Sequence, residues 1–117
     1  MTRDVQLVQD LVSRVPAFGG LYDAHVFNND GVLPHVIFWE ITQDTVRSHL
    51  GADDAPDWRE TLRFLEEQMG PEIPEINTVI VTSFLFALPW PHKAGYGIVQ
   101  ELGPRLAKAF AKIRPSG

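Results

Sequence analysis

The sequence predicts an all-α fold: a compact bundle of about five main helices and one or two short ones around a buried central helix. The first observation behind this prediction is an uncharged apolar run, INTVIVTSFLFAL, at residues 76–88 between Pro74 and Pro89. The second is that the flanking segments repeat their apolar residues at helical spacing, with proline or glycine between them. We expect a single domain, residues 1–117.

The run at 76–88 is apolar around most of a helical circumference, with a narrow polar strip at Thr78 and Thr82. Such a helix must be enclosed by its neighbours. At 13 residues it is too short to span a bilayer, which needs about 20 residues. A strand is the alternative, because Val, Ile, Thr and Phe favour strands. The length of the run and the bounding prolines favour the helix.

Two helices are expected at the start of the chain. The segment from Asp4 to Val15 places its valines and leucines on one stripe, and Pro16 ends it. Residues 18–26 supply a shorter apolar set, which predicts one or two helical turns. The sequence NNDG at 28–31 has the composition of a turn.

A longer helix is expected from Pro34 to Leu50, with Gly51 as its stop. Its charged residues, Glu40, Asp44 and Arg47, gather on one side. The apolar residues form two neighbouring faces, Val36, Trp39, Val46 and Leu50 on one and Ile37 and Ile41 on the other. We therefore expect this helix to pack on two neighbours and to keep one charged strip in water.

The remaining elements follow from similar signals. The acidic residues at 53–57 begin a helix that runs to Met69, where Gly70 and Pro71 stop it. After the central helix we expect a stiff loop, a short helix at 95–102, and a last amphipathic helix with Leu106, Phe110 and Ile113 inside.

Composition excludes several classes of function. A net charge of −5 argues against nucleic acid as a partner, because phosphate binding needs a basic surface. The absence of cysteine leaves no disulfide and no thiolate metal site. No secretory signal and no membrane span are visible at the N-terminus or elsewhere, so we expect a cytoplasmic protein without a cofactor.

No catalytic or metal site is expected. His35 and His49 lie 14 residues apart on one helix, which separates them by about 21 Å and prevents a shared metal. The serines sit in no nucleophile motif, and no glycine-rich phosphate loop is present. Glu40 and Asp44 are one turn apart, but with Arg47 they are typical of a solvated strip. We therefore expect a protein that is not an enzyme.

Charge is segregated along the chain. Residues 53–75 carry −6 and the rest of the chain +1, while the tail holds Arg105, Lys108, Lys112 and Arg114 without an acid. An acidic patch favours a basic protein partner, and an aromatic ring among carboxylates is typical of a binding hot spot. The predicted partner-binding residues are Asp53, Asp54, Asp57, Glu60, Phe64, Glu66 and Glu67. The alternatives are solvated helix faces and a Phe64 that packs on a second helix.

The loop at 88–97, LPWPHKAGYG, is the other candidate site. Its Trp90, His92, Lys93 and Tyr96 offer contacts for a small ligand. The alternative is a rigid connector whose tryptophan folds onto the core, because prolines fix such loops.

Four segments together resemble a family of small bacterial helical proteins. They are LVxxVPxF (residues 11–18), LPHVIFWEIT (33–42), WRETLRFLEEQM (58–69) and EINTVIVTSFLFAL (75–88). The resemblance covers most of residues 7–110, and the family is similar to the immunity proteins of polymorphic toxin systems. It implies a helical fold but carries over no catalytic residue. The chain departs from the family pattern at Phe86 and Ala87, where a polar pair is expected.

The sequence leads to a functional hypothesis: a cytoplasmic immunity-type protein that binds and inhibits a cognate toxin through its acidic surface. A nuclease would fit as the toxin, because nucleases present a basic cleft to phosphates. One alternative is a small-molecule-binding protein or enzyme that uses the 88–97 loop. Another is a structural homo-oligomer with Phe64 or Trp90 buried between chains, and the choice between monomer and homodimer stays open.

Overall fold

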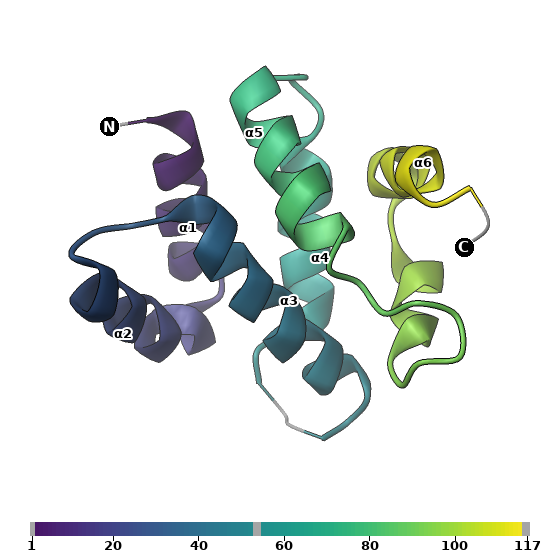
Figure 1. Ribbon diagram of the computed structural model, residues 1–117, viewed down its shortest axis with the longest axis horizontal. Coiled ribbons are helices and arrows are strands. Elements are labelled where there is room, and N and C mark those ends of the chain that lie inside the picture. Colours follow the sequence, from purple (N-terminus) through teal and green to yellow (C-terminus); the bar gives the residue numbers. More distant parts are fainter. Residues whose placement is uncertain (1, 53–54, 116–117) are drawn as a thin grey trace.

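The computed structural model describes residues 2–52 and 55–115, and every regular element among them is a helix, which confirms the all-α prediction (Figure 1). No helix in these two ranges is long and apolar enough to cross a membrane. The elements are the α-helices α1 (Arg3–Arg14), α2 (Gly19–Asn29), α3 (Pro34–His49), α4 (Trp58–Gln68), α5 (Pro74–Val79) and α6 (Pro104–Ile113), the 3₁₀ helices η1 (Pro16–Phe18) and η3 (Tyr96–Glu101), and the π-helix η2 (Ile80–Leu85).

The expected central helix is present as α5 continued directly by η2. Figure 1 shows this segment in the middle of the molecule, with α1 and α2 on one side and α6 on the other. Val79, Ile80, Phe84 and Leu85 have no exposed surface. The narrow polar strip faces water, because Thr78 and Thr82 are exposed. The run 76–88 therefore forms the core as a helix and not as a strand.

The connection between α2 and α3 differs from the prediction, because α2 continues through the two asparagines assigned to a turn. Asp30 then adopts a left-handed conformation at φ 54° and ends the helix. Asn29 stabilises this end by donating from its side chain to the His25 carbonyl at 2.9 Å. The buried His25 ring accepts a hydrogen bond from the Leu33 N–H at 2.9 Å and so fixes the start of α3.

The buried face of α3 is the principal correction to the sequence analysis. Val36, Trp39 and Leu50, expected to pack against a neighbour, are each about half exposed. The predicted face of Ile37 and Ile41 does enter the core, and it is joined there by Phe38 and by three small polar residues, Thr42, Thr45 and Ser48.

Burial of the polar residues of α3 is possible because their hydroxyls find partners. Thr42 and Thr45 donate to the carbonyls of the residues four positions earlier, at 2.8 and 2.7 Å. Ser48 donates to the Pro56 carbonyl at 2.5 Å. A hydroxyl bonded in this way can enter a core at little cost. These polar residues can therefore lie in the core beside Ile37, Phe38 and Ile41.

Candidate functional site

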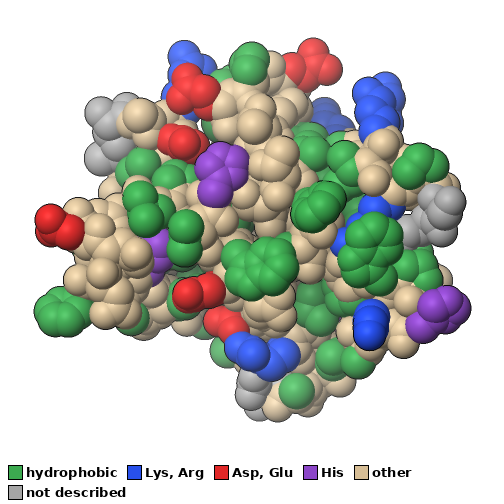
Figure 2. Space-filling view, viewed as in Figure 1, with side chains coloured by type: hydrophobic (Ala, Val, Ile, Leu, Met, Phe, Trp, Pro, Cys, Tyr) green, Lys and Arg blue, Asp and Glu red, His purple; other side chains and the backbone are tan. Residues whose placement is uncertain are grey.

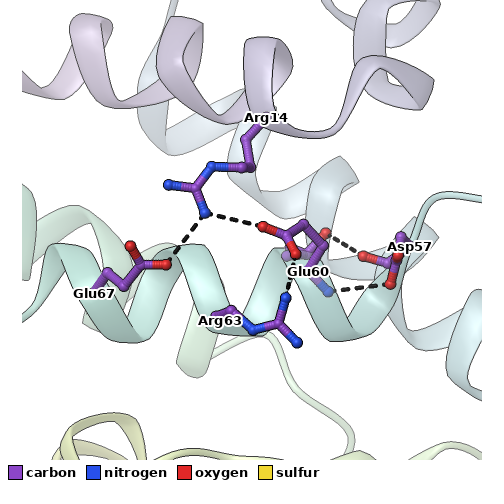
Figure 3. A network of polar contacts seen from close by, with 6 residues as sticks. Arg14, Asp57, Glu60, Arg63 and Glu67 are labelled. Atoms are coloured by element: carbon purple, nitrogen blue, oxygen red, sulfur yellow. Dashed lines mark hydrogen bonds and ion pairs between the residues drawn. The ribbon is translucent and has the colours of Figure 1, made fainter.

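Two carboxylates of the acidic segment accept hydrogen bonds from backbone N–H groups at the starts of helices. Asp57 is the N-cap of α4 and accepts from the Glu60 N–H at 3.1 Å (Figure 3). Glu66 accepts from the backbone N–H groups of Arg105 and Leu106 at 2.9 and 3.0 Å, at the start of α6. These two carboxylates therefore stabilise helix ends, where orphan N–H groups and the helix dipole favour negative charge.

Two further carboxylates of α4 pair with a cation that comes from α1. Figure 3 shows Arg14 reaching across to α4, where its Nη1 lies 2.9 Å from Glu60 and 3.2 Å from Glu67. Arg63 also pairs with Glu60, at 2.5 Å. The hydrogen bonds that Arg14 donates to Glu67 and Glu60 raise the pKa of Arg14 above its ordinary value. We name Asp57, Glu60, Glu66 and Glu67 the acidic surface; each of its members is already engaged within the chain.

Phe64 does not provide the exposed anchor that the sequence analysis placed in this surface. Its side chain is 2% exposed and belongs to the core, which is the packed alternative considered above. The guanidinium of Arg14 lies over the Phe64 ring, 5.4 Å from its centroid. Asp53 and Asp54, which were also predicted to contact a partner, lie outside the described residues.

The 88–97 loop is held by Arg114, the residue that follows α6. Arg114 donates from its guanidinium to the carbonyls of Phe86 and Pro89, each at 2.8 Å, and to that of Leu88. The same guanidinium stacks over the ring of Trp90, 3.9 Å from its centroid. Burial lowers the pKa of Arg114, so the alternative of a solvated helix face does not hold for this residue.

The four residues proposed as a ligand loop occupy different settings. Trp90 is 54% exposed and does not fold onto the core. His92, in a left-handed conformation at φ 79°, and Lys93 are exposed, while Tyr96 is half-buried at the start of η3. Gly95 fits between α3 and the loop, because its φ of 90° suits glycine and a Cβ there would meet Val46.

Exposed apolar residues of α3 and of the chain after η2 form a surface that the sequence analysis did not identify. Their exposed fractions are 48% for Val36, 54% for Trp39, 55% for Phe86 and 54% for Trp90. Figure 2 shows hydrophobic side chains gathered over α3 and over the chain that follows α5. We name Val36, Trp39, Phe86 and Trp90 the aromatic face.

Contacts between α3 and η2 bring the two halves of the aromatic face together. His35 Nδ1 lies 2.6 Å from the Ser83 hydroxyl, and the Thr42 hydroxyl lies 3.5 Å from the Phe84 carbonyl. Edge-on packing of Phe38 against Phe84, with ring centroids 6.5 Å apart, fixes the same pair of helices from inside. The exposed rings therefore stand on a rigid base, which limits the conformational entropy lost when a partner binds.

A sequence signal for the aromatic face existed in α3. The helix carries more apolar surface than one core-facing stripe needs, and Val36 and Trp39 form a stripe of their own beside Ile37 and Ile41. The additional apolar stripe must either pack against a second neighbouring element or remain exposed on the surface.

The Ser83–His35 contact was also not anticipated. A histidine beside a serine hydroxyl is one requirement for nucleophilic catalysis. Ser83 is buried in the core, however, and joins η2 to the start of α3. Within residues 2–52 and 55–115, no three His, Asp or Glu side chains come together in an arrangement that would hold a metal ion.

Comparison with known protein families, with characterised proteins and with solved structures finds no match to this chain.

Proposed function

We propose that this protein is a binding domain that recognises another protein through the aromatic face. The observation that carries the proposal is that Trp39 on α3, and Phe86 and Trp90 in the chain after η2, each expose more than half of their surface. Tryptophan is among the residues most enriched in binding hot spots, and large exposed apolar patches on soluble proteins mark interaction sites. Burying these rings against a partner would remove the apolar area from water.

We infer further that the partner is a cognate toxin and that the protein acts in the bacterial cytoplasm as an immunity-type inhibitor. The resemblance to polymorphic-toxin immunity proteins supports this proposal. The charge distribution also supports it, since an acidic protein suits a target with a basic active-site cleft. In this arrangement the acidic surface attracts the toxin and the aromatic face forms the buried contact.

The 88–97 loop takes part in this function as a protein contact. Its Trp90 belongs to the aromatic face, and Arg114 fixes the orientation of that ring through the stacking contact and the loop carbonyls. A rigid aromatic side chain loses little entropy on binding, which suits a protein interface.

The test is a binding measurement between the purified protein and the product of the neighbouring gene in the native host. Trp39→Ala is expected to weaken binding roughly 30-fold, because a hot-spot residue contributes about 2 kcal/mol. Phe27→Ala is the matched control, because Phe27 is 87% exposed on α2 and lies outside the aromatic face. Co-expression should also protect cells from the neighbouring protein, and Trp39→Ala should reduce that protection.

Two outcomes would contradict the proposal. Equal losses from Trp39→Ala and Phe27→Ala would remove the aromatic face as the binding surface. Binding without any protection of the cell would leave a binding domain but would remove the toxin-inhibitor assignment. Far-UV circular dichroism of each variant shows whether a loss of binding reflects unfolding.

A further inference from the structure

A groove between α6, η2 and the end of α4 has a chemistry different from that of either surface described above. Its volume is about 430 Å³. Val81, Ala109 and Ile113 contribute apolar surface to its floor, and three cations of α6 form one rim: Arg105, Lys108 and Lys112. We name this feature the α6 groove; it shares no residue with the aromatic face.

The cations of the α6 groove are largely free to bind an anion. Lys108 and Lys112 are exposed, and neither forms an ion pair with a carboxylate among residues 2–52 and 55–115. Arg105 is partly engaged, with its Nη1 3.6 Å from Glu66. Glu72 is the acidic residue of the lining, so the groove remains net positive in a protein of charge −5.

We infer that the α6 groove binds an acidic amphipathic helix of a protein partner. Lys108 and Lys112 are four residues apart on α6, which separates them by about 6 Å along the helix axis. Carboxylates one turn apart on a bound helix have the same separation. The apolar floor of the groove would contact the apolar face of the bound helix, as in other complexes that place a helix in a groove.

The spacing of the cations favours a peptide over a single anionic head group. Arg105 and Lys112 are seven residues apart on α6, or about 10 Å along its axis, so the three cations match a row of carboxylates better than a single one. Asn77 adds a second reason, because this residue lines the groove and its buried Oδ1 has no hydrogen-bond partner among the described residues. Rotation of that amide would let it accept from an N–H of the bound segment, which a fatty acid cannot supply.

The experiment uses the full chain and a fluorescein-labelled synthetic helix that carries Leu on one face and Glu on both flanks. Fluorescence anisotropy should show binding that weakens as salt is raised, and a peptide with Gln in place of Glu should bind much more weakly. Lys112→Glu is expected to weaken binding about fivefold, because it replaces an attraction by a repulsion. Arg3→Glu is the matched control, since Arg3 is exposed at the start of α1 and undergoes the same charge reversal.

A variant without a charge change tests the floor of the groove. Ala109→Leu adds volume to the lining and should also weaken binding of the Glu peptide, while circular dichroism verifies the fold. Four results would overturn the inference: no binding at millimolar peptide, equal binding of the Glu and Gln peptides, equal effects of Lys112→Glu and Arg3→Glu, or no effect of Ala109→Leu in a folded protein.

Two other occupants have distinct signatures. If dodecanoate binds, if Lys112→Glu weakens that binding, and if the peptide does not bind, the groove is a fatty-acid site. Self-association in analytical ultracentrifugation that Lys112→Glu abolishes would identify a second copy of this chain as the occupant. Either result would overturn the peptide assignment.

Discussion

Arg114 connects the last residues of α6 to the end of the central segment. Its side chain is 3% exposed. Its guanidinium donates to three backbone carbonyls that follow η2, those of Phe86, Leu88 and Pro89. Carbonyls at the end of a helix have no partner within that helix. The planar guanidinium suits this role, because several donors in a fixed fork can reach separate acceptors while the ring face of Trp90 stacks on the plane.

Replacing Arg114 by methionine is expected to lower the free energy of unfolding by about 2–4 kcal/mol, since buried carbonyls then lose charged hydrogen-bond donors. Arg114→Lys should recover only a small part of the loss, because a single ammonium cannot serve three carbonyls and stack on Trp90. Urea denaturation of both variants measures the difference. Lys108→Met, at an exposed position of the same helix, should change stability little. An equal loss of stability in that control would show that the loss of a positive charge, and not the loss of the hydrogen bonds of Arg114, causes the effect.

At the scale of the element, α6 depends on α4 for its N-terminal cap. The N-cap position of α6 is Gly103, which has no side chain, and the first helical position is Pro104, which has no N–H. The next two N–H groups, of Arg105 and Leu106, are left without an acceptor in their own helix. Glu66 supplies both acceptors from α4, and so fixes how the two helices pack.

Glu66→Ala is therefore expected to reduce stability by about 1–2 kcal/mol, the usual cost of removing a side-chain cap. Chemical denaturation measures the loss, and Glu75→Ala is the control, because Glu75 is an exposed carboxylate of the same acidic segment. A result in which both variants behave alike would show that the cap contributes nothing beyond its charge.

Gly103→Ala tests the same contact from the other side. A Cβ at this position would lie 2.5 Å from Glu66 Oε1 and 2.9 Å from its Cγ. The Glu66 side chain would have to move away from the N–H groups that it caps, so we expect a loss of about 1–2 kcal/mol. Alanine at the exposed Gly20 of α2 should not destabilise the protein, because a Cβ there meets nothing within 4 Å. Equal stability of Gly103→Ala and the unmodified chain would contradict this account of the cap.

The elements were predictable where one local signal governs the backbone. Pro34 stands at the first position of α3 as expected, and Gly51 follows the end of α3 at φ 82°. The π-helical winding of η2 was not predictable, because apolar spacing does not distinguish it from an α-helix over six residues. The length of α2 was missed because Asn29 satisfies its polar groups within the helix instead of starting a turn.

The candidate site was less predictable than the fold because both of its surfaces depend on tertiary contacts. Charge counting located an acidic segment, yet Arg14 and the start of α6 engage its carboxylates from distant parts of the chain. Hydrophobic periodicity does not distinguish Trp39 from Phe64, because both are apolar residues on helices. Only packing decides that Phe64 is covered by α1 and that Trp39 remains exposed.

At the scale of the molecule, charge and apolar surface are separated between different elements. Glu72 and Glu75 add exposed negative charge next to α4, and the protein as a whole carries −5. The acidic surface keeps its ion pairs in the folded chain, so it is better suited to attracting a basic partner than to forming its buried contact. The aromatic face has the opposite properties, because apolar contact acts at short range and resists salt.

This division predicts how the proposed toxin complex responds to salt. Raising the ionic strength should lower the association rate constant by about tenfold, because long-range attraction is screened, and should leave the dissociation rate nearly unchanged. Glu75→Lys should reduce the association rate at low salt only, whereas Trp39→Ala should mainly accelerate dissociation. Surface plasmon resonance at low and high salt separates the two rate constants. If salt instead accelerates dissociation and Trp39→Ala leaves it unaltered, the carboxylates of α4 form the buried contact and the assignment of the two surfaces must be exchanged.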